Sequence, residues 1–202
     1  MVMEESRTMP SKRQHNTDGR IARGERTRDA IVEAHTDLLR EGVLKPTGKL
    51  IADRAGISVR TLWANFKDLE ALLQATTAYW DTADLELRVT VEPSLPLDER
   101  IDAFCSQRAA RLEHIAPAAR SAVLGEPFSA ALQKSRQTHV DRLRSEIEVL
   151  FASEIAKGGD ELKYALVTAT SWPNWQIMRD DYGLEPGQII AIMRRTLHAL
   201  LD

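Results

Sequence analysis

The sequence predicts an all-α protein of about nine helices, and three observations point to this fold class. Apolar residues recur at helical spacing from residue 25 to the C-terminus. Glycines, prolines and capping residues divide this region into segments of helical length. The chain shows no alternating strand pattern, no hairpin dipeptide and no internal repeat.

Residues 1–24 are polar and lack periodicity, so we expect a flexible arm there. Five basic residues give the arm its charge: Arg7, Lys12, Arg13, Arg20 and Arg23. Such an arm can lie along DNA phosphates or in a minor groove. An unstructured tail without a function fits the same residues.

The first helix is expected after residue 24, where apolar residues begin to share one face. These residues are Ala30, Ile31, Ala34, Leu38 and Leu39, and Gly42 ends the run. Three more helices follow, each preceded by a residue whose side chain can cap it. The expected caps and spans are Thr47 before a helix ending at Ala55, Ser58 before Val59–Phe66, and Asp68 before a helix from Leu69 to about Val89.

Breaker residues divide the remainder into further helices. The expected spans are Asp98 to about His114, a short piece between Pro117 and Gly125-Glu126-Pro127, Phe128–Lys157, Asp160 to about Asp181, and Pro186–Leu201. Phe128–Lys157 would form one helix about 45 Å long. Gly158 and Gly159 would end it.

Composition indicates a globular protein of a reducing compartment. The 202 residues include 43% hydrophobic and 28% charged side chains, which suits one large domain or two small ones. Cys105 is the only cysteine, so no internal disulfide can form. No apolar run is long enough to span a membrane, and the start lacks the apolar centre of a signal peptide. We therefore expect a cytoplasmic protein without membrane contact.

The net charge of −3 is unevenly distributed along the chain. Residues 1–75 carry 13 Lys and Arg against 11 Asp and Glu, whereas residues 76–202 carry 14 against 19. The first part can therefore approach a polyanion, and the second would be a poor surface for nucleic acid.

Gly56-Ile57-Ser58 separates two short helices, which is the pattern of a helix-turn-helix unit. Gly56 lies just past the end of the first, where a left-handed backbone suits glycine. The second helix then presents an outer face that consists of Val59, Arg60, Thr61, Ala64 and Asn65. Arginine can bond guanine, asparagine can bond adenine, and a Val or Thr methyl can touch thymine. Ser58 suits a phosphate oxygen.

The segment "TGKLIADRAGISVRTLWANFKDLEALL" resembles the DNA-binding segment of TetR-family transcriptional regulators. The matching positions are Thr47, Ile51, Ala52, Ala55, Gly56, Ile57, Ser58, Thr61, Leu62, Phe66, Glu70 and Leu72. Three positions depart from the family pattern: Trp63 replaces the usual Tyr, Leu69 the usual Lys, and Gly48 an apolar residue. The C-terminal segment "TSWPNWQIMRDDYGLEPGQIIAIMRRTLHALL" resembles the family's last two helices, which typically pack two subunits together.

The resemblance implies a helix-turn-helix domain over residues 25–72 and a helical ligand-binding and dimerisation domain over residues 73–202. It implies a homodimeric repressor that binds a palindromic operator with half-sites about 34–36 Å apart. The candidate DNA contacts are Thr47, Lys49, Ser58, Val59, Arg60, Thr61, Trp63, Ala64, Asn65 and Lys67.

The last helix carries apolar residues on more than one stripe, so one stripe can face its own domain and another a partner. Burial of the whole helix within a monomer is the alternative. Large aromatic residues on the preceding helix can anchor an interface or fill a core. The candidate interface residues are Trp175, Arg179, Ile189, Ile190, Met193, Leu197, Leu200 and Leu201.

The resemblance also implies a small-molecule effector bound in the larger domain. Aromatic or polar residues on faces that should turn inward are the candidates for its pocket: Trp80, Phe104, Arg108, Phe128, His139, Leu143, Trp172 and Gln176. For each of them, packing in the core is the plainer interpretation. His139 in particular shares an apolar stripe with Leu132 and Leu143.

An enzyme is not expected. The five histidines show no paired metal-ligand spacing, and the sequence has no phosphate-binding glycine loop or nucleophile motif. Asp180, Asp181 and Glu185 could bind a divalent cation, but solvated acidic residues at a helix end are the simpler interpretation. We expect no cofactor and no metal. A regulator-like module that binds a ligand or protein after losing sequence-specific DNA binding is the alternative function.

Overall fold

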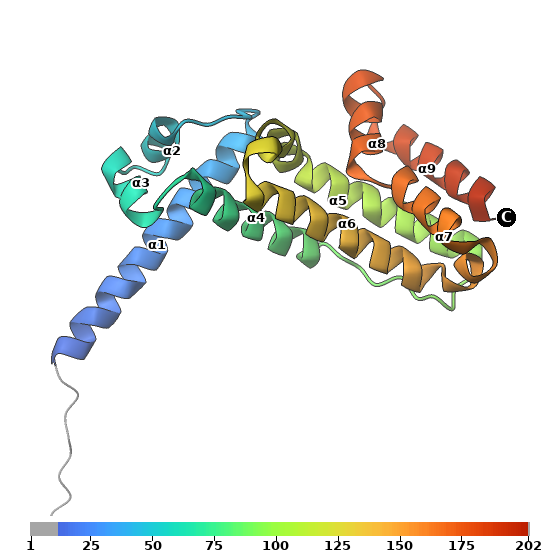
Figure 1. Ribbon diagram of the computed structural model, residues 1–202, viewed down its shortest axis with the longest axis horizontal. Coiled ribbons are helices and arrows are strands. Elements are labelled where there is room, and N and C mark those ends of the chain that lie inside the picture. Colours follow the sequence, from blue (N-terminus) through green and yellow to red (C-terminus); the bar gives the residue numbers. More distant parts are fainter. Residues whose placement is uncertain (1–11, 202) are drawn as a thin grey trace, which may run out of the picture.

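The computed structural model describes residues 12–201, which form nine α-helices and, within that range, no strand (Figure 1). The all-α prediction is therefore confirmed. The helices are α1 (Lys12–Arg40), α2 (Gly48–Arg54), α3 (Val59–Asn65), α4 (Leu69–Glu86), α5 (Leu97–Gly125), α6 (Ala130–Leu150), α7 (Ala152–Ala169), α8 (Trp172–Gln176) and α9 (Pro186–Leu201). A short 3₁₀ turn, Glu126–Phe128, precedes α6, and a π-helical turn, Ile177–Asp181, follows α8.

Two hydrophobic cores lie at opposite ends of the molecule (Figure 1). The smaller core joins α1, α2, α3 and the start of α4, and the larger one joins α5, α6, α7, α8 and α9. The smaller core consists of Ile31, Ala34, Leu38, Ile51, Ala52, Leu62, Phe66 and Leu72, all buried. Helix α4 extends from the smaller core along α6, so it connects the two ends.

The predicted caps of α2, α3 and α4 are confirmed. Thr47 Oγ1 accepts from Leu50 N at 3.2 Å, Ser58 Oγ accepts from Thr61 N at 3.0 Å, and Asp68 Oδ1 accepts from Ala71 N at 2.8 Å. Each bond satisfies one of the backbone donors left free in a first helical turn. Gly56 has φ +66°, as a glycine just past a helix end should.

Helix α1 begins well before residue 25, so the boundary predicted for the arm is wrong from Lys12 onward. Residues 1–11, including Arg7, lie outside the described part of the chain. The early turns of α1 project from the body (Figure 1), and no apolar stripe is needed where a helix packs against nothing. Side chains instead bond to the helix itself: Arg26 donates to the Ala22 carbonyl and Thr27 to the Arg23 carbonyl.

Helix α5 runs unbroken past Pro117, where the sequence predicted an end. Proline removes a single N–H from the helical ladder, and packing of the residues before it can offset that cost. Here Leu112, Ile115 and Ala116 are buried immediately before it. The predicted helix end at His114 is therefore wrong.

The predicted 30-residue helix Phe128–Lys157 is instead two helices that meet at Phe151. Phe151 leaves the helical region (φ −117°, ψ 31°) and is fully buried, edge-on to Phe104 at 5.8 Å between ring centroids. Arg100 from α5 donates to the freed Leu150 carbonyl at 2.6 Å and to Glu154 at 2.7 Å. A tertiary contact, rather than glycine or proline, ends α6.

Helix α7 also ends earlier than the sequence predicted, at Ala169 instead of Asp181. Gly159, with φ +73°, kinks it where a glycine break was expected. Beyond Thr170 the chain turns into α8, with Pro173 in its first turn. Helix α9 has the predicted bounds, Pro186–Leu201.

Three hydrogen bonds made by side chains join the two ends of the molecule. Glu70, in the first turn of α4, accepts from Ser129 Oγ at 2.7 Å and from Ala131 N at 2.6 Å at the start of α6. Ser121 near the end of α5 donates to the Leu44 carbonyl, ahead of α2, at 2.7 Å. These bonds fix where the α1–α3 unit sits on the larger core. None of the described helices combines the length and apolarity that crossing a membrane requires.

Candidate nucleic-acid interface

The turn between α2 and α3 fixes which face of α3 looks outward. Ile57 N donates to the Ala52 carbonyl at 3.0 Å, and Ile51, Leu62 and Phe66 are fully buried against α1. The buried face of α3 therefore belongs to the core, and its opposite face is left to solvent.

Most of the predicted DNA contacts lie on this outward face or beside it. Exposed residues are Thr47, Lys49, Ser58, Val59, Arg60, Trp63, Ala64 and Lys67. They come from the start of α2, from α3 and from the turn after it, and together they form one side of the α1–α3 unit. Val59 and Trp63 are 39% and 37% exposed, which is high for large apolar side chains outside an interface.

Thr61 and Asn65 are half-buried and engaged within α3. Asn65 Nδ2 donates to the Thr61 carbonyl at 2.8 Å, and the Thr61 hydroxyl lies 2.8 Å from Ser58 Oγ. One of the two N–H donors of the Asn65 amide is therefore used within the helix. Asn65 fits the predicted base contact less well than its place in the sequence indicated.

Helix α3 is anchored from α1 by Arg28. The Arg28 guanidinium donates to the Asn65 carbonyl at the end of α3 and lies over the Phe66 ring, with Cζ 4.1 Å from the centroid. A cation at a helix C-terminus bonds the free carbonyls and opposes the negative end of the dipole. The sequence analysis did not single out Arg28, because its partner is 37 residues away.

The basic side chains of this surface differ in whether they are paired with a carboxylate. Lys49 pairs with Asp53 at 2.6 Å and Arg54 with Glu41 at 2.6 Å. Lys67 lies 3.8 Å from Asp68 and its side chain is 82% exposed. Arg60 pairs with no carboxylate among residues 21–201. Arg60 and Lys67 are thus the cations best placed to meet a nucleic acid.

The larger unit buries half of the predicted dimer surface in its own core. Trp175 of α8 and the α9 residues Ile189, Met193 and Leu197 are at most 2% exposed, and this stripe of α9 packs on α5. Their assignment to a partner contact is wrong. Ile190 and Leu201 are partly buried against the same core, and Arg179 bonds Glu113 at 3.1 Å.

The second stripe of α9 is exposed and borders an apolar groove. Ile192 and Leu200 are 41% and 37% exposed. The groove measures about 750 Å³ and runs between α7, α9 and the π-helical turn. Its other large apolar side chains are Tyr164, Ile177, Met178 and Tyr182. The sequence pattern indicated two stripes, but only the structure distinguishes the buried one from the exposed one.

The residues predicted to line an effector pocket do not form one cavity. Trp80, Phe104 and Leu143 are buried, whereas Phe128 is 90% exposed on the 3₁₀ turn. Its inward orientation was predicted wrongly, because the turn places it beyond the end of α5. Trp172 is half-buried, and the centroid of its ring lies 5.8 Å from Cζ of Arg120. Gln176, on α8, is also half-buried.

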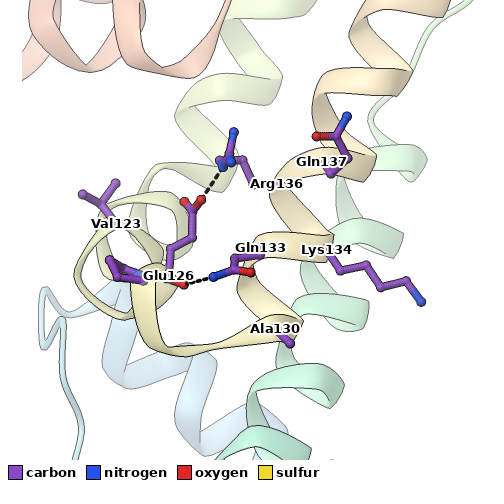
Figure 2. Close-up of a pocket in the computed structure, with 8 residues that line it drawn as sticks. Val123, Glu126, Ala130, Gln133, Lys134, Arg136 and Gln137 are labelled. Atoms are coloured by element: carbon purple, nitrogen blue, oxygen red, sulfur yellow. Dashed lines mark hydrogen bonds and ion pairs between the residues drawn. The ribbon is translucent and has the colours of Figure 1, made fainter.

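None of these eight residues lines either of two further surface hollows. One, of about 730 Å³, lies at the corner between α5 and α6, beside the ion pair of Glu126 and Arg136 (Figure 2). The other, of about 370 Å³, runs between α4 and α6 past Gln74 and Thr138.

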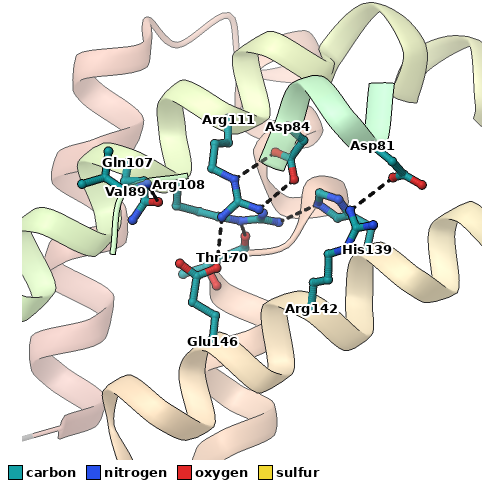
Figure 3. Close-up of polar contacts among 10 residues, drawn as sticks. All are labelled: Asp81, Asp84, Val89, Gln107, Arg108, Arg111, His139, Arg142, Glu146 and Thr170. Atoms are coloured by element: carbon teal, nitrogen blue, oxygen red, sulfur yellow. Dashed lines mark hydrogen bonds and ion pairs between the residues drawn. The ribbon is translucent and has the colours of Figure 1, made fainter. Parts of the chain in front are cut away.

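Arg108 and His139, from the same predicted set, meet inside a buried polar network (Figure 3). Arg108 Nε donates to the Thr170 carbonyl at 2.8 Å, and its Nη2 lies 3.2 Å from His139 Nε2. A guanidinium has only donors, so His139 accepts at Nε2 and holds its proton on Nδ1. Burial, and then the charge of Arg108, lowers the pKa of His139 to about 4.

The same network contains an ion triad that the sequence analysis missed. Arg111 donates to Asp84 at 2.9 and 2.7 Å and to Glu146 at 3.0 Å (Figure 3). Arg142 reaches Asp81 at 3.4 Å at its edge. Helices α4, α5 and α6 each supply one partner of the triad, so spacing along one helix could not predict it. Among the described residues no cluster of side chains is suited to hold a metal ion.

Comparison with known proteins places the fold. No family model matches the sequence, and no curated protein is significantly similar to it. The structure is similar to the crystal structure of a transcriptional regulator from Rhodococcus sp. Rha1, with a TM-score of 0.68 and 14% identity. The match covers 88% of this chain and 95% of that one. At this identity the likeness shows a shared fold.

Proposed function

We propose that this chain is a TetR-like transcriptional regulator that binds a palindromic DNA operator as a homodimer. The observation that carries the proposal is the outward face of α3. It presents Val59, Arg60, Trp63 and Ala64 on a helix that is capped at its start and anchored at its end. The shared fold with a solved transcriptional regulator supports the same proposal.

The roles of individual residues follow from their chemistry. Arg60, which is exposed and pairs with no carboxylate of residues 21–201, can bond guanine O6 and N7 in the major groove. Val59 can pack on a thymine methyl, and Lys67 and Ser58 suit phosphate oxygens. Residues 25–72 then form the DNA-binding domain, and residues 73–202 the domain that pairs subunits and binds an effector.

The apolar groove along α9 is the surface that we assign to the homodimer. Ile192, Leu200, Tyr164 and Tyr182 expose apolar area there, and a second copy can cover it. This surface replaces the half of the predicted interface that lies in the core. Two subunits would place their α3 helices in successive major grooves, about 34–36 Å apart.

The proposal also includes a small-molecule effector: the protein represses transcription when bound to its operator, and the effector weakens that binding. An effector would favour a dimer geometry that misplaces the two α3 helices, and couplings of this kind are typically about 1–3 kcal/mol. Because the predicted lining residues form no single cavity, an effector site among them would require a rearrangement of α4, α5 and α6.

A second candidate function is a regulator-like module without sequence-specific DNA binding. It is favoured by the side chains that are already occupied: the Asn65 amide is bonded within α3, and Lys49 and Arg54 are paired with carboxylates. Such a module would recognise a ligand or a protein through its larger unit.

Selection of bound fragments from the source genome tests the two functions against each other. A regulator enriches a small set of sequences with two related half-sites, and Arg60→Ala relaxes the preference at one position of each half-site. Lys67→Ala weakens binding to all duplexes alike. It also reduces the slope of log affinity against log salt concentration by about one, because one phosphate contact is lost. Lys157→Ala on α7 is the matched control and should leave binding unchanged. No enrichment over random competitor DNA would favour the module.

A further inference from the structure

The helix-turn-helix unit contains two glycines that differ in why the position is glycine. Gly56 has φ +66°, and a Cβ there would meet no atom within 4 Å, so its backbone conformation is the reason. Gly48, the first residue of α2, has no such conformation, because its φ lies outside the left-handed region. Another cause must explain Gly48.

The cause is the Trp63 side chain, which fills the space that a side chain at position 48 would take. A Cβ on residue 48 would lie 2.7 Å from Cζ2, 3.3 Å from Cε2 and 3.5 Å from Nε1 of Trp63. Carbon atoms without a bond between them normally lie about 3.5–4.0 Å apart. The edge of the indole ring therefore rests directly on the backbone at the start of α2.

This contact determines how the indole is presented. Trp63 belongs to α3, and its ring crosses to α2, so it bridges the two short helices while remaining 37% exposed. The Nε1 edge faces the start of α2, next to the exposed Thr47 and Lys49. No residue of the described chain accepts a hydrogen bond from Nε1, so this donor is available to another molecule.

We propose that Gly48 is a positioning residue for Trp63: the missing side chain lets the indole lie across α2 and direct Nε1–H toward a DNA phosphate. The inference rests on the proposed DNA binding. It assigns Gly48 a role in recognition although Gly48 touches no DNA itself, and it makes positions 48 and 63 a size-matched pair.

The proposal predicts that Gly48→Ala destabilises the fold, whereas helix propensity alone predicts that this substitution stabilises it. Replacing a helical glycine by alanine normally stabilises, because alanine loses less backbone entropy on folding. At position 48 the added methyl instead overlaps the Trp63 ring, which must leave its contact with α2, and such overpacking destabilises. This destabilisation should disappear when Trp63 is removed.

A double-mutant cycle tests this in the full chain with Gly48→Ala, Trp63→Ala and the pair of changes. With Trp63 present, Gly48→Ala should lower the thermal midpoint by roughly 2–6 °C. It should also weaken binding to a random-sequence duplex at low ionic strength by about tenfold. In the Trp63→Ala background it should raise the midpoint slightly and leave the already weakened duplex binding unchanged.

Gly187→Ala is the matched control, because Gly187 lies in the first turn of α9 and an added Cβ meets no atom within 4 Å. It should be neutral or slightly stabilising and bind duplex as the unmodified chain does. Stabilisation by Gly48→Ala with Trp63 present, or equal effects in both backgrounds, would overturn the inference. If the unmodified chain binds no duplex, the proposed function fails. The thermal cycle then still decides whether Trp63 packs on Gly48.

Discussion

Replacing Arg111 by methionine is the sharpest test of how the larger unit is held together. Arg111 gives two hydrogen bonds to Asp84 and one to Glu146, and its side chain is 3% exposed (Figure 3). Methionine has a similar length but no charge. Its introduction leaves the carboxylate of Asp84, 1% exposed, buried without its only direct guanidinium partner.

The magnitude follows from the burial of both partners. Breaking a buried ion pair by removing one partner typically costs about 3–5 kcal/mol, because the remaining charge has no compensation. For a chain of this size about 1 kcal/mol corresponds to about 2–4 °C in the thermal midpoint, so a drop of roughly 6–20 °C is expected. Arg108 does not replace Arg111, because it donates to Thr170 and His139.

The loss should also depend on pH, with a defined sign. Burial raises the pKa of Asp84, but the bonds and charge of Arg111 outweigh it and hold that pKa below its usual value. Without Arg111, burial is opposed only by the charges of His139 and Arg108, which do not bond Asp84, and we expect the pKa of Asp84 to rise above its unfolded value. A group with a raised folded pKa favours the folded state as pH falls. The deficit of the Arg111→Met variant should therefore shrink between neutral pH and about pH 5.

Urea unfolding followed by circular dichroism, at both pH values, measures the deficit. Arg142→Met is the matched control, because Arg142 pairs with Asp81 at 3.4 Å with both side chains 27% exposed. That pair is longer and more solvent-accessible than the Arg111–Asp84 pair, so its loss should cost much less than the loss of Arg111. Equal losses for the two variants, or a loss that grows on acidification, would refute the reasoning.

Two further predictions concern the groove along α9 and the junction of α5 with α7. Ile192→Arg changes an exposed residue of the groove and should give folded monomers with much weaker duplex binding. Leu197 is fully buried, so Leu197→Arg should instead unfold the larger core. Sedimentation detects the monomers and circular dichroism detects the unfolding. Unchanged sedimentation of Ile192→Arg would remove the groove from the dimer. Arg100 lowers the pKa of Glu154 to about 2, so this pair adds stability above the unfolded pKa that is lost as pH falls toward 2. Glu154→Gln should flatten acid unfolding in that range, and an acid midpoint unchanged by the substitution would contradict the assignment.

Local signals predicted α2, α3 and the start of α4 well, because these elements are short and each is set by neighbouring residues. Thr47, Ser58 and Asp68 cap the helices that they precede, and Gly56 takes the left-handed conformation. A cap bond joins residues three apart, so the sequence alone contains both partners. The outward residues of α3 follow directly once its buried face is known.

Long-range contacts explain where prediction from the sequence failed. Helix α6 ends at Leu150 because Arg100, 50 residues earlier, bonds its last carbonyl. Helix α5 continues through Pro117 because its neighbours pack in the core. Neither cause is visible in a window of a few residues. The same holds for the two apolar stripes of α9, since periodicity finds both and only packing on α5 decides which is buried.

Two departures from the family pattern that looked independent in the sequence are one contact in the structure. Trp63 is larger than the usual tyrosine and Gly48 is smaller than the usual apolar residue, and their atoms would overlap if position 48 carried a side chain. Considered separately, each change looked like a weakening of the helix-turn-helix unit. Considered together, they conserve the packed volume between α2 and α3.

Adjacent residues at the end of α5 contact both surfaces on which the proposed function depends. Arg120 forms a bidentate pair with Asp180, in the π-helical turn that borders the α9 groove. Ser121 donates to the Leu44 carbonyl, in the segment that leads into α2. A rearrangement that moves the end of α5 must therefore stretch a bond to the proposed dimer surface, a bond to the proposed DNA-binding unit, or both. The short path between the two surfaces is why a change in subunit pairing would be felt at α3 without a long chain of intermediates.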